Sequence, residues 1–118
     1  CALPISKGKT MTLDEYQAWA RTTAIYPADH AIDYCVHGLT SEAGEVAGKW
    51  KKVLRDECGQ LTADNASVVA SELGDVLWYV ANLAYETGVS LDDLARSNMA
   101  KLNDRKARGV IGGSGDKR

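Results

Sequence analysis

One short phrase occurs twice in the chain and restricts how it can fold. "SEAGEVA" covers residues 41–47 and "SELGDVL" covers residues 71–77, so each copy has two carboxylates three residues apart. On a helix, successive residues rotate by about 100°, which places Glu45 about 60° from Glu42 and Asp75 about 60° from Glu72. The same rotation gives an apolar stripe beside each acidic pair: Leu39, Val46, Trp50 and Val53, then Val69, Val76, Val80 and Leu83. The repeat predicts two amphipathic helices whose acidic edges converge if the stripes pack together.

Four converging carboxylates, Glu42, Glu45, Glu72 and Asp75, would repel one another unless a cation lay among them. Oxygen ligands without His or Cys favour Mg²⁺, Mn²⁺ or Ca²⁺ over zinc. Mg²⁺ usually takes one or two protein carboxylates and completes its coordination with waters and substrate phosphates, so two ions could fit this edge. The pattern points to metal-assisted attack of water on a phosphate group, with a spare carboxylate as base. Each acidic pair alone would suit a solvated helix face, but the doubled phrase favours the metal site.

A glycine lies inside each copy of the phrase, at Gly44 and Gly74. Glycine in a helix interior costs about 1 kcal/mol relative to alanine, so two at matching places need a reason. Either a ligand approaches the backbone there, or two helices pack tightly.

Four helices are predicted, at about residues 13–25, 30–55, 63–87 and 90–108, and no strand alternation is found. Both prolines lie in the first quarter of the chain, so the later helices can be long. These segments predict an all-α protein, a small four-helix bundle.

Three local signals set the helix ends. "TLDE" from Thr12 matches a capping box with Glu15, and Ser90 is an N-cap residue. Gly88 is a natural left-handed cap. The expected organisation is a flexible lead over 1–11, a single helical domain over 12–108, and a Gly-rich tail over 109–118 that is either flexible or closes over something.

The distribution of charge restricts the partners. The net charge of −2 divides into −6 over residues 1–100 and +4 over residues 101–118. An acidic body argues against DNA or RNA as a partner, but the basic end could hold a nucleotide phosphate. Three scattered cysteines fit a reduced, cytoplasmic protein. No apolar run is long enough to span a membrane, and the first residues lack the apolar run of a signal peptide.

The four acids form two motifs, Glu42-x-x-Glu45 and Glu72-x-x-Asp75, separated by a spacer of 26 residues. This pattern resembles the E-x-x-E…E-x-x-D signature of the MazG-like all-α nucleoside triphosphate pyrophosphohydrolases. The group is related to dimeric dUTPases and phosphoribosyl-ATP pyrophosphohydrolases. "GLTSEAGEVAGKWKK", "ELGDVLWYVANLA", "NMAKLNDRKARGV" and "GSGD" resemble small members, so the likeness covers about residues 12–118. The resemblance implies Mg²⁺-dependent cleavage of a (d)NTP to a (d)NMP and pyrophosphate, with Mn²⁺ as a substitute. It implies that the four acids are catalytic metal ligands, and that a homodimer or homotetramer completes its sites across subunits.

Other residues are candidates for binding the nucleotide. Lys49 and Lys52 lie near the first acidic pair and could meet phosphates, or could be ordinary solvated lysines. Asn98, Lys101 and Arg105 resemble the family element that holds sugar and phosphates, or form a solvated basic face. Asn82 could contact the nucleotide or bond a neighbouring helix. Trp19, like Tyr16 and Tyr79, could stack on a base, although aromatics at helical spacing are more often core.

Two other functions compete with this enzyme. A helical module could sense nucleotides or bind a protein while keeping the cation site and lacking catalysis. Alternatively, the enzyme could act on a pyrimidine dNTP or on phosphoribosyl-ATP. The chain has no P-loop motif and no Glu-x-x-His motif, which argues against P-loop proteins and di-iron bundles.

Overall fold

A computed structural model describes residues 10–118, and all regular secondary structure within that range is helical. The helices are α1 (Leu13–Arg21), α2 (Ala31–Asp56), α3 (Ala63–Glu86) and α4 (Leu91–Ala107), with a short 3₁₀ turn η1 (Ala28–His30) before α2. The all-α class and the four predicted helices are confirmed, and the bounds of α2, α3 and α4 agree within one residue. Most of the predicted flexible lead lies outside the described residues. No helix between residues 10 and 118 is long and apolar enough to cross a membrane.

The first helix is shorter than predicted, because it ends at Arg21 instead of continuing to about residue 25. The hydroxyls of Thr22 and Thr23 donate to the carbonyls of Trp19 and Ala20 at 2.6 and 3.0 Å. Threonine side chains can bond backbone groups in this way, in competition with a continuing helix. The spacing of apolar residues, from which the helix was predicted, does not indicate these side-chain bonds.

The predicted caps at Thr12, Gly88 and Ser90 are present, but the bond from the Thr12 amide to the Glu15 side chain, which would complete the predicted capping box, is not formed. Thr12 accepts from the amide of Glu15 at 3.0 Å, and Ser90 accepts from that of Asp93 at 3.1 Å. Gly88, at φ +80°, ends α3 in a Schellman motif, in which the amide of Val89 bonds the carbonyl of Ala84 at 2.8 Å. These caps direct the chain sharply from α3 into α4.

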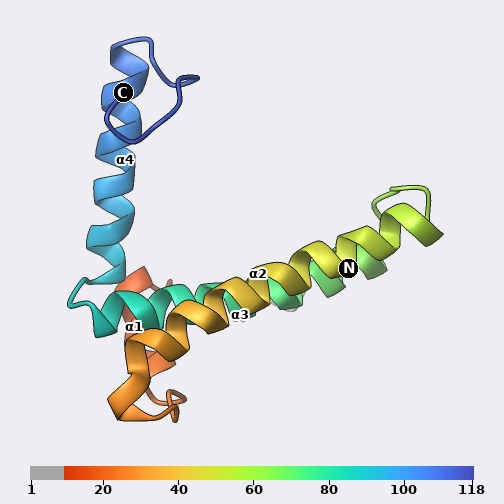
Figure 1. Ribbon diagram of the computed structural model, residues 1–118, viewed down its shortest axis with the longest axis horizontal. Helices are drawn as coiled ribbons and strands as arrows, with labels where there is room; N and C mark the ends of the chain where they lie inside the picture. The colour runs from red at the N-terminus through yellow and green to blue at the C-terminus, as the bar shows by residue number, and fades with distance from the viewer. Residues whose placement is uncertain (1–9) are drawn as a thin grey trace.

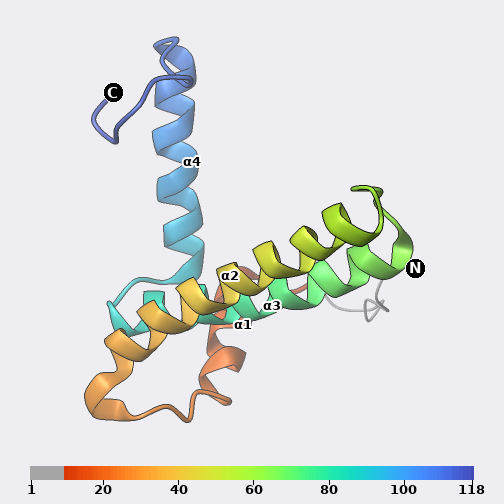
Figure 2. The ribbon, with the colours of Figure 1, turned by 45° about the vertical axis from the view of Figure 1, so that its right-hand side comes forward.

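The helices do not form a closed bundle. Helices α2 and α3 make a long antiparallel hairpin, α1 crosses α3 at one end, and α4 projects away from the hairpin (Figures 1 and 2). The radius of gyration is 17.0 Å, whereas a compact domain of this length has about 13.5 Å. The prediction of a four-helix bundle is therefore wrong for a single chain, because α4 packs only at its start and never along α2.

The core is small and lies at the corner where α1, α3 and α4 meet. Ala20, Ala81, Ala84 and Leu91 are buried there, with Tyr16, Trp78 and Val80 packed around them. Many large apolar side chains elsewhere remain exposed: Ile32, Val36, Leu54, Leu61, Val68, Leu73 and Leu77. Exposed apolar side chains that gather into large patches often mark interfaces, and these seven all lie on the long hairpin or in the turn that joins its helices.

The Gly-rich tail turns back against the end of α4. Arg105 is 4% exposed, and its Nη2 donates to the carbonyl of Asp116 at 2.8 Å. The amide of Val110 bonds the carbonyl of Arg105 at 2.9 Å. Residues 109–118 thus lie against the helix that precedes them.

Candidate metal centre

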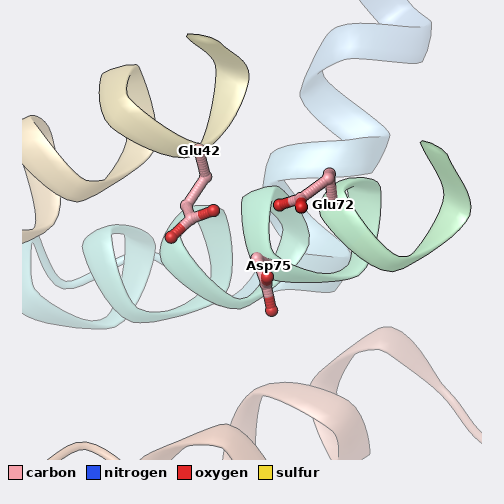
Figure 3. A group of neighbouring side chains, drawn as sticks. All are labelled: Glu42, Glu72 and Asp75. Atoms are coloured by element: carbon pink, nitrogen blue, oxygen red, sulfur yellow. The ribbon is translucent and has the colours of Figure 1, made fainter. Parts of the chain in front are cut away.

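Three of the four predicted acids converge where α2 and α3 pack together. Carboxylate oxygens of Glu42, Glu72 and Asp75 all lie within 4.8 Å of one another (Figure 3). Glu42 comes from α2, and the other two are one turn apart on α3. The convergence follows from the antiparallel hairpin, which brings together the acidic edges of the two helices.

The fourth acid, Glu45, does not belong to this group. It is exposed on α2, and its carboxylate lies outside the 4.8 Å cluster. It is nevertheless one of the charges that raise the pKa of Glu42. The structure therefore separates three clustered carboxylates from one nearby acid.

The electrostatics of the cluster favour a cation. Burial first, and then the charges of Asp75, Glu72 and Glu45, raise the pKa of Glu42. Within residues 10–118, no Lys or Arg forms an ion pair with a carboxylate of the cluster. Oxygen ligands alone, from carboxylates, suit a hard divalent ion such as Mg²⁺ or Mn²⁺. The residues present thus fit the metal that the sequence pattern predicts.

An open hollow of about 300 Å³ adjoins the cluster, lined by Glu42, Asp75, Trp78 and Tyr79. Trp78 is half-buried, and its Nε1 donates to Thr23 Oγ1 at 2.7 Å. Burial, the neighbouring Tyr34 and Glu42 raise the pKa of Tyr79 to about 12, so its hydroxyl stays neutral at pH 7. Sequence reasoning missed Trp78, although it follows Asp75 at the same three-residue step that separates Glu72 from Asp75.

The structure supports one of the two roles predicted for Asn82. Its side chain is 0% exposed: Nδ2 donates to the carbonyl of Trp78, and Oδ1 accepts from Arg21 Nη1, both at 3.1 Å. Of the two roles predicted for Asn82, packing between helices is the one that the structure contains. A buried amide whose donor and acceptor are both bonded inside the protein is not available to a nucleotide.

A single chain does not bring Asn98, Lys101 and Arg105 together with the acidic cluster, because α4 projects away from the hairpin (Figure 2). Asn98 and Lys101 line a separate hollow of about 440 Å³ with Val89, Leu94 and Ser97. Arg105 is buried under the tail. The predicted basic element is thus divided between two exposed residues and one that holds the tail.

The remaining candidates lie on α1 and α2. Lys49 is half-buried and Lys52 is exposed, both beyond Glu45 on α2. Trp19 is 55% exposed on α1, with its ring centroid 5.8 Å from that of Tyr16. An exposed tryptophan is free to stack on a ligand, but Trp19 is not among the described residues that form the cluster or line its hollow.

Comparisons with known proteins agree with the acidic pattern. A family model described as the MazG nucleotide pyrophosphohydrolase domain matches residues 32–110. The gene 37 protein of Mycobacterium phage L5 is 47% identical over 114 residues, which cover 92% of this chain and all of the relative. No solved structure matches the chain. The matched range contains all four acids and the whole of α4.

Proposed function

Because the chain belongs to the MazG nucleotide pyrophosphohydrolase domain family, we propose that it is a metal-dependent nucleoside triphosphate pyrophosphohydrolase. The reaction converts a (d)NTP to a (d)NMP and pyrophosphate and would remove unwanted nucleotides from the cytoplasmic pool. The observation that carries the proposal is the cluster of Glu42, Glu72 and Asp75 within 4.8 Å, to which no Lys or Arg of the described residues is paired.

The three clustered carboxylates would hold Mg²⁺, and Glu45 could join them or remain free. When bound, Mg²⁺ offsets the charge of the phosphates and lowers the pKa of coordinated water. Glu45, which is exposed and whose charge reaches Glu42, would accept the proton of the attacking water. The oxygen of water then bonds to a phosphorus of the α–β phosphoanhydride and the bridging P–O bond breaks. Trp78 and Tyr79, which line the adjoining hollow, would exclude water from one side of the phosphates.

The protein would act as a homodimer or homotetramer. An apolar groove of about 480 Å³ lies in the corner between the hairpin and α4, lined by Ile32, Val36, Leu39, Val80, Leu83, Ala84, Thr87 and Leu94. A second copy would cover this groove and could bring Asn98 and Lys101 of its α4 to the first copy's acids. Sedimentation equilibrium tests this part: Val36→Lys should shift the protein toward a monomer, and an unchanged mass would contradict it.

The reaction is tested by incubating the protein with a panel of NTPs and dNTPs, in Mg²⁺ and in EDTA, and separating the products. We expect monophosphate and pyrophosphate, only with metal. Diphosphate and orthophosphate would place the cleavage at another bond. Metal-dependent nucleotide binding without product would instead support a sensing module.

The matched variants are Asp75→Asn and Asp64→Asn. Both replace an exposed carboxylate on α3, but only Asp75 belongs to the cluster. Asp75→Asn should abolish turnover and keep the helical content, while Asp64→Asn should retain activity. Full turnover by Asp75→Asn would refute the metal assignment.

A further inference from the structure

The first turn of α4 is held mainly by α1. The opening amides of a helix have no partner within the helix. Here the three bonds run from Leu91 N to Gln17 Oε1 (3.1 Å), from Asp92 N to Asp14 Oδ1 (2.8 Å) and from Asp93 N to Ser90 Oγ (3.1 Å). Only the last is an ordinary N-cap. Two of the three acceptors come from another helix, more than 70 residues away in the sequence.

Gln17 bonds to three segments at once. Its side chain is buried, and Nε2 donates to the carbonyl of Ala81 at 3.1 Å and to that of Val89 at 3.0 Å. With the bond from Leu91, one planar amide joins α3, the connecting loop and α4. Because its bonds leave in fixed directions, the amide restricts the angle between α3 and α4 as well as their separation.

Beyond its first turn, α4 has little to fix its direction. Leu91 is 2% exposed in the core, but the rest of the helix projects from the corner (Figure 1). Its 17 residues make a rod about 25 Å long. A rotation at the corner therefore displaces Asn98 and Lys101, which lie about 10 and 15 Å along this rod from Leu91.

Helix α1, which holds the start of α4, also contacts residues near the acidic cluster. Tyr16 packs against the core residues Ala81 and Ala84 of α3 and Leu91 of α4 as part of one cluster. Just beyond the helix, Thr23 accepts from Trp78, which lines the hollow beside Asp75. Helix α1 is therefore in contact with both the metal-site helix and the start of α4.

We infer that Gln17 and Asp14 are positioning residues that fix the direction of α4, and with it the place of Asn98 and Lys101. The direction of α4 is a property of the fold alone. Its consequence for catalysis rests on the proposed function.

The direction can be measured by electron paramagnetic resonance between two spin labels. One label goes on Lys51→Cys of α2 and one on Ala100→Cys of α4, both exposed positions. Cys1 and Cys58 are replaced by serine, and Cys35 stays because it is 0% exposed. Mixing the labelled protein with an excess of unlabelled protein suppresses the signal from pairs of labels on different copies.

The test variant is Gln17→Met, which keeps the shape and removes the three bonds. Its control is Asn65→Leu, which removes an equally buried amide that bonds Thr62 and Gln60 at the opposite end of the hairpin. We expect the distance distribution to broaden or shift in Gln17→Met and to stay narrow in Asn65→Leu. An unchanged distribution in Gln17→Met, or equal broadening in the control, would overturn the inference.

A second pair covers the case in which Gln17→Met fails to fold. Asp14→Ala removes the acceptor of Asp92 N, whereas Asp14→Asn keeps a side-chain oxygen in the same place. The inference is supported if the distance distribution broadens in Asp14→Ala and remains that of the wild type in Asp14→Asn. The inference is overturned if both variants keep the wild-type distance distribution at unchanged helical content.

The catalytic consequence has its own measurement. For the best nucleotide of the panel, Gln17→Met should raise KM about tenfold, as for the loss of a good hydrogen bond to a phosphate, and leave kcat nearly unchanged. The affinity of the nucleotide-free protein for Mn²⁺ should not change. If Mn²⁺ affinity falls instead of KM rising, the positioning role is wrong. If the wild-type protein has no turnover, the proposed function fails, while the spin-label distances still test the direction of α4.

Discussion

The ring of Tyr79 on α3 occupies the space where a side chain on Gly38 of α2 would lie. A Cβ at residue 38 would overlap three ring carbons of Tyr79. Gly38 precedes Glu42 by one helical turn, and Tyr79 follows Asp75 by one turn. The close approach of backbone and ring therefore sets the separation of the two helices next to the clustered acids.

Replacing Gly38 should consequently be costly. An alanine inside a helix usually gains about 1 kcal/mol over glycine. Here we expect Gly38→Ala to lose about 1–3 kcal/mol of unfolding free energy, because the rigid ring of Tyr79 must move. Urea denaturation measures this change, and a titration with Mn²⁺ should show weaker binding. A Gly38→Ala protein as stable as the wild type would mean that the hairpin opens without strain at this point.

The glycines of the doubled phrase make the opposite prediction. A Cβ at Gly44 or Gly74 would meet nothing within 4 Å, so tight packing against another helix of the same chain is not their reason. Gly44→Ala and Gly74→Ala should each stabilise the chain by up to about 1 kcal/mol in urea denaturation. If turnover falls in the same variants, the space belongs to a ligand or a second copy. If turnover is unchanged, neither glycine serves the site.

The contrast shows which features could be predicted from the sequence. The helices and their caps follow from periodicity and local chemistry, because each depends on residues within a few turns. The convergence of Glu42 with Glu72 and Asp75 was predictable for another reason: the repeated phrase puts an acidic edge beside an apolar stripe on each of two helices. Gly38 and Tyr79 are 41 positions apart, and no local pattern indicates that they meet. The direction of α4 likewise depends on Gln17, a polar residue whose burial cannot be recognised without the corner that it fills. The sequence likewise left two roles open for Asn82, contact with the nucleotide or a bond to a neighbouring helix, because its burial depends on the tertiary structure.

A half-buried ion pair at the end of α3, between Arg21 and Glu86, should make stability depend on pH. Glu86 accepts from Tyr26 Oη and Arg21 Nη1, both at 2.7 Å, and these bonds lower the pKa of Glu86. A lowered pKa in the folded state means that the stabilisation is present above the unfolded pKa and is lost as pH falls through the folded one. The unfolding free energy of the wild type should therefore decline as pH drops below about 4.3, the usual value for glutamate.

Glu86→Gln tests this dependence. The variant should lose about 1–3 kcal/mol at pH 7, as for a hydrogen bond to a charged group, and its stability should change less between pH 7 and pH 3. Glu57→Gln is the control, because Glu57 is an exposed carboxylate in the turn after α2. Parallel pH profiles for wild type and Glu86→Gln would show that the pair does not contribute.

Divalent metal should stabilise the protein through the acidic cluster. An ion that binds only the folded state adds stability of RT ln(1 + [M]/Kd), about 2.7 kcal/mol at 100 times Kd. We expect Mg²⁺ to raise Tm in the wild type and not in Asp75→Asn. Glu45→Gln should keep most of the rise, because Glu45 lies outside the group, while turnover falls. An equal loss of the Mg²⁺ effect in both variants would place Glu45 among the essential ligands.

Arg105 and Lys101 should separate into two roles on α4. Lys101 is exposed beside Asn98 in the hollow, whereas Arg105 is buried and bonded to the carbonyl of Asp116. Lys101→Ala should raise KM about tenfold for the best nucleotide, as for one lost charge-assisted hydrogen bond, and leave the tail in place. Arg105→Ala should free residues 109–118, which trypsin would then cleave faster at Lys117, with a smaller effect on KM. If Arg105→Ala instead gives the larger rise in KM at an unchanged cleavage rate, Arg105 contacts the phosphates and its bond to the tail must open when the nucleotide binds.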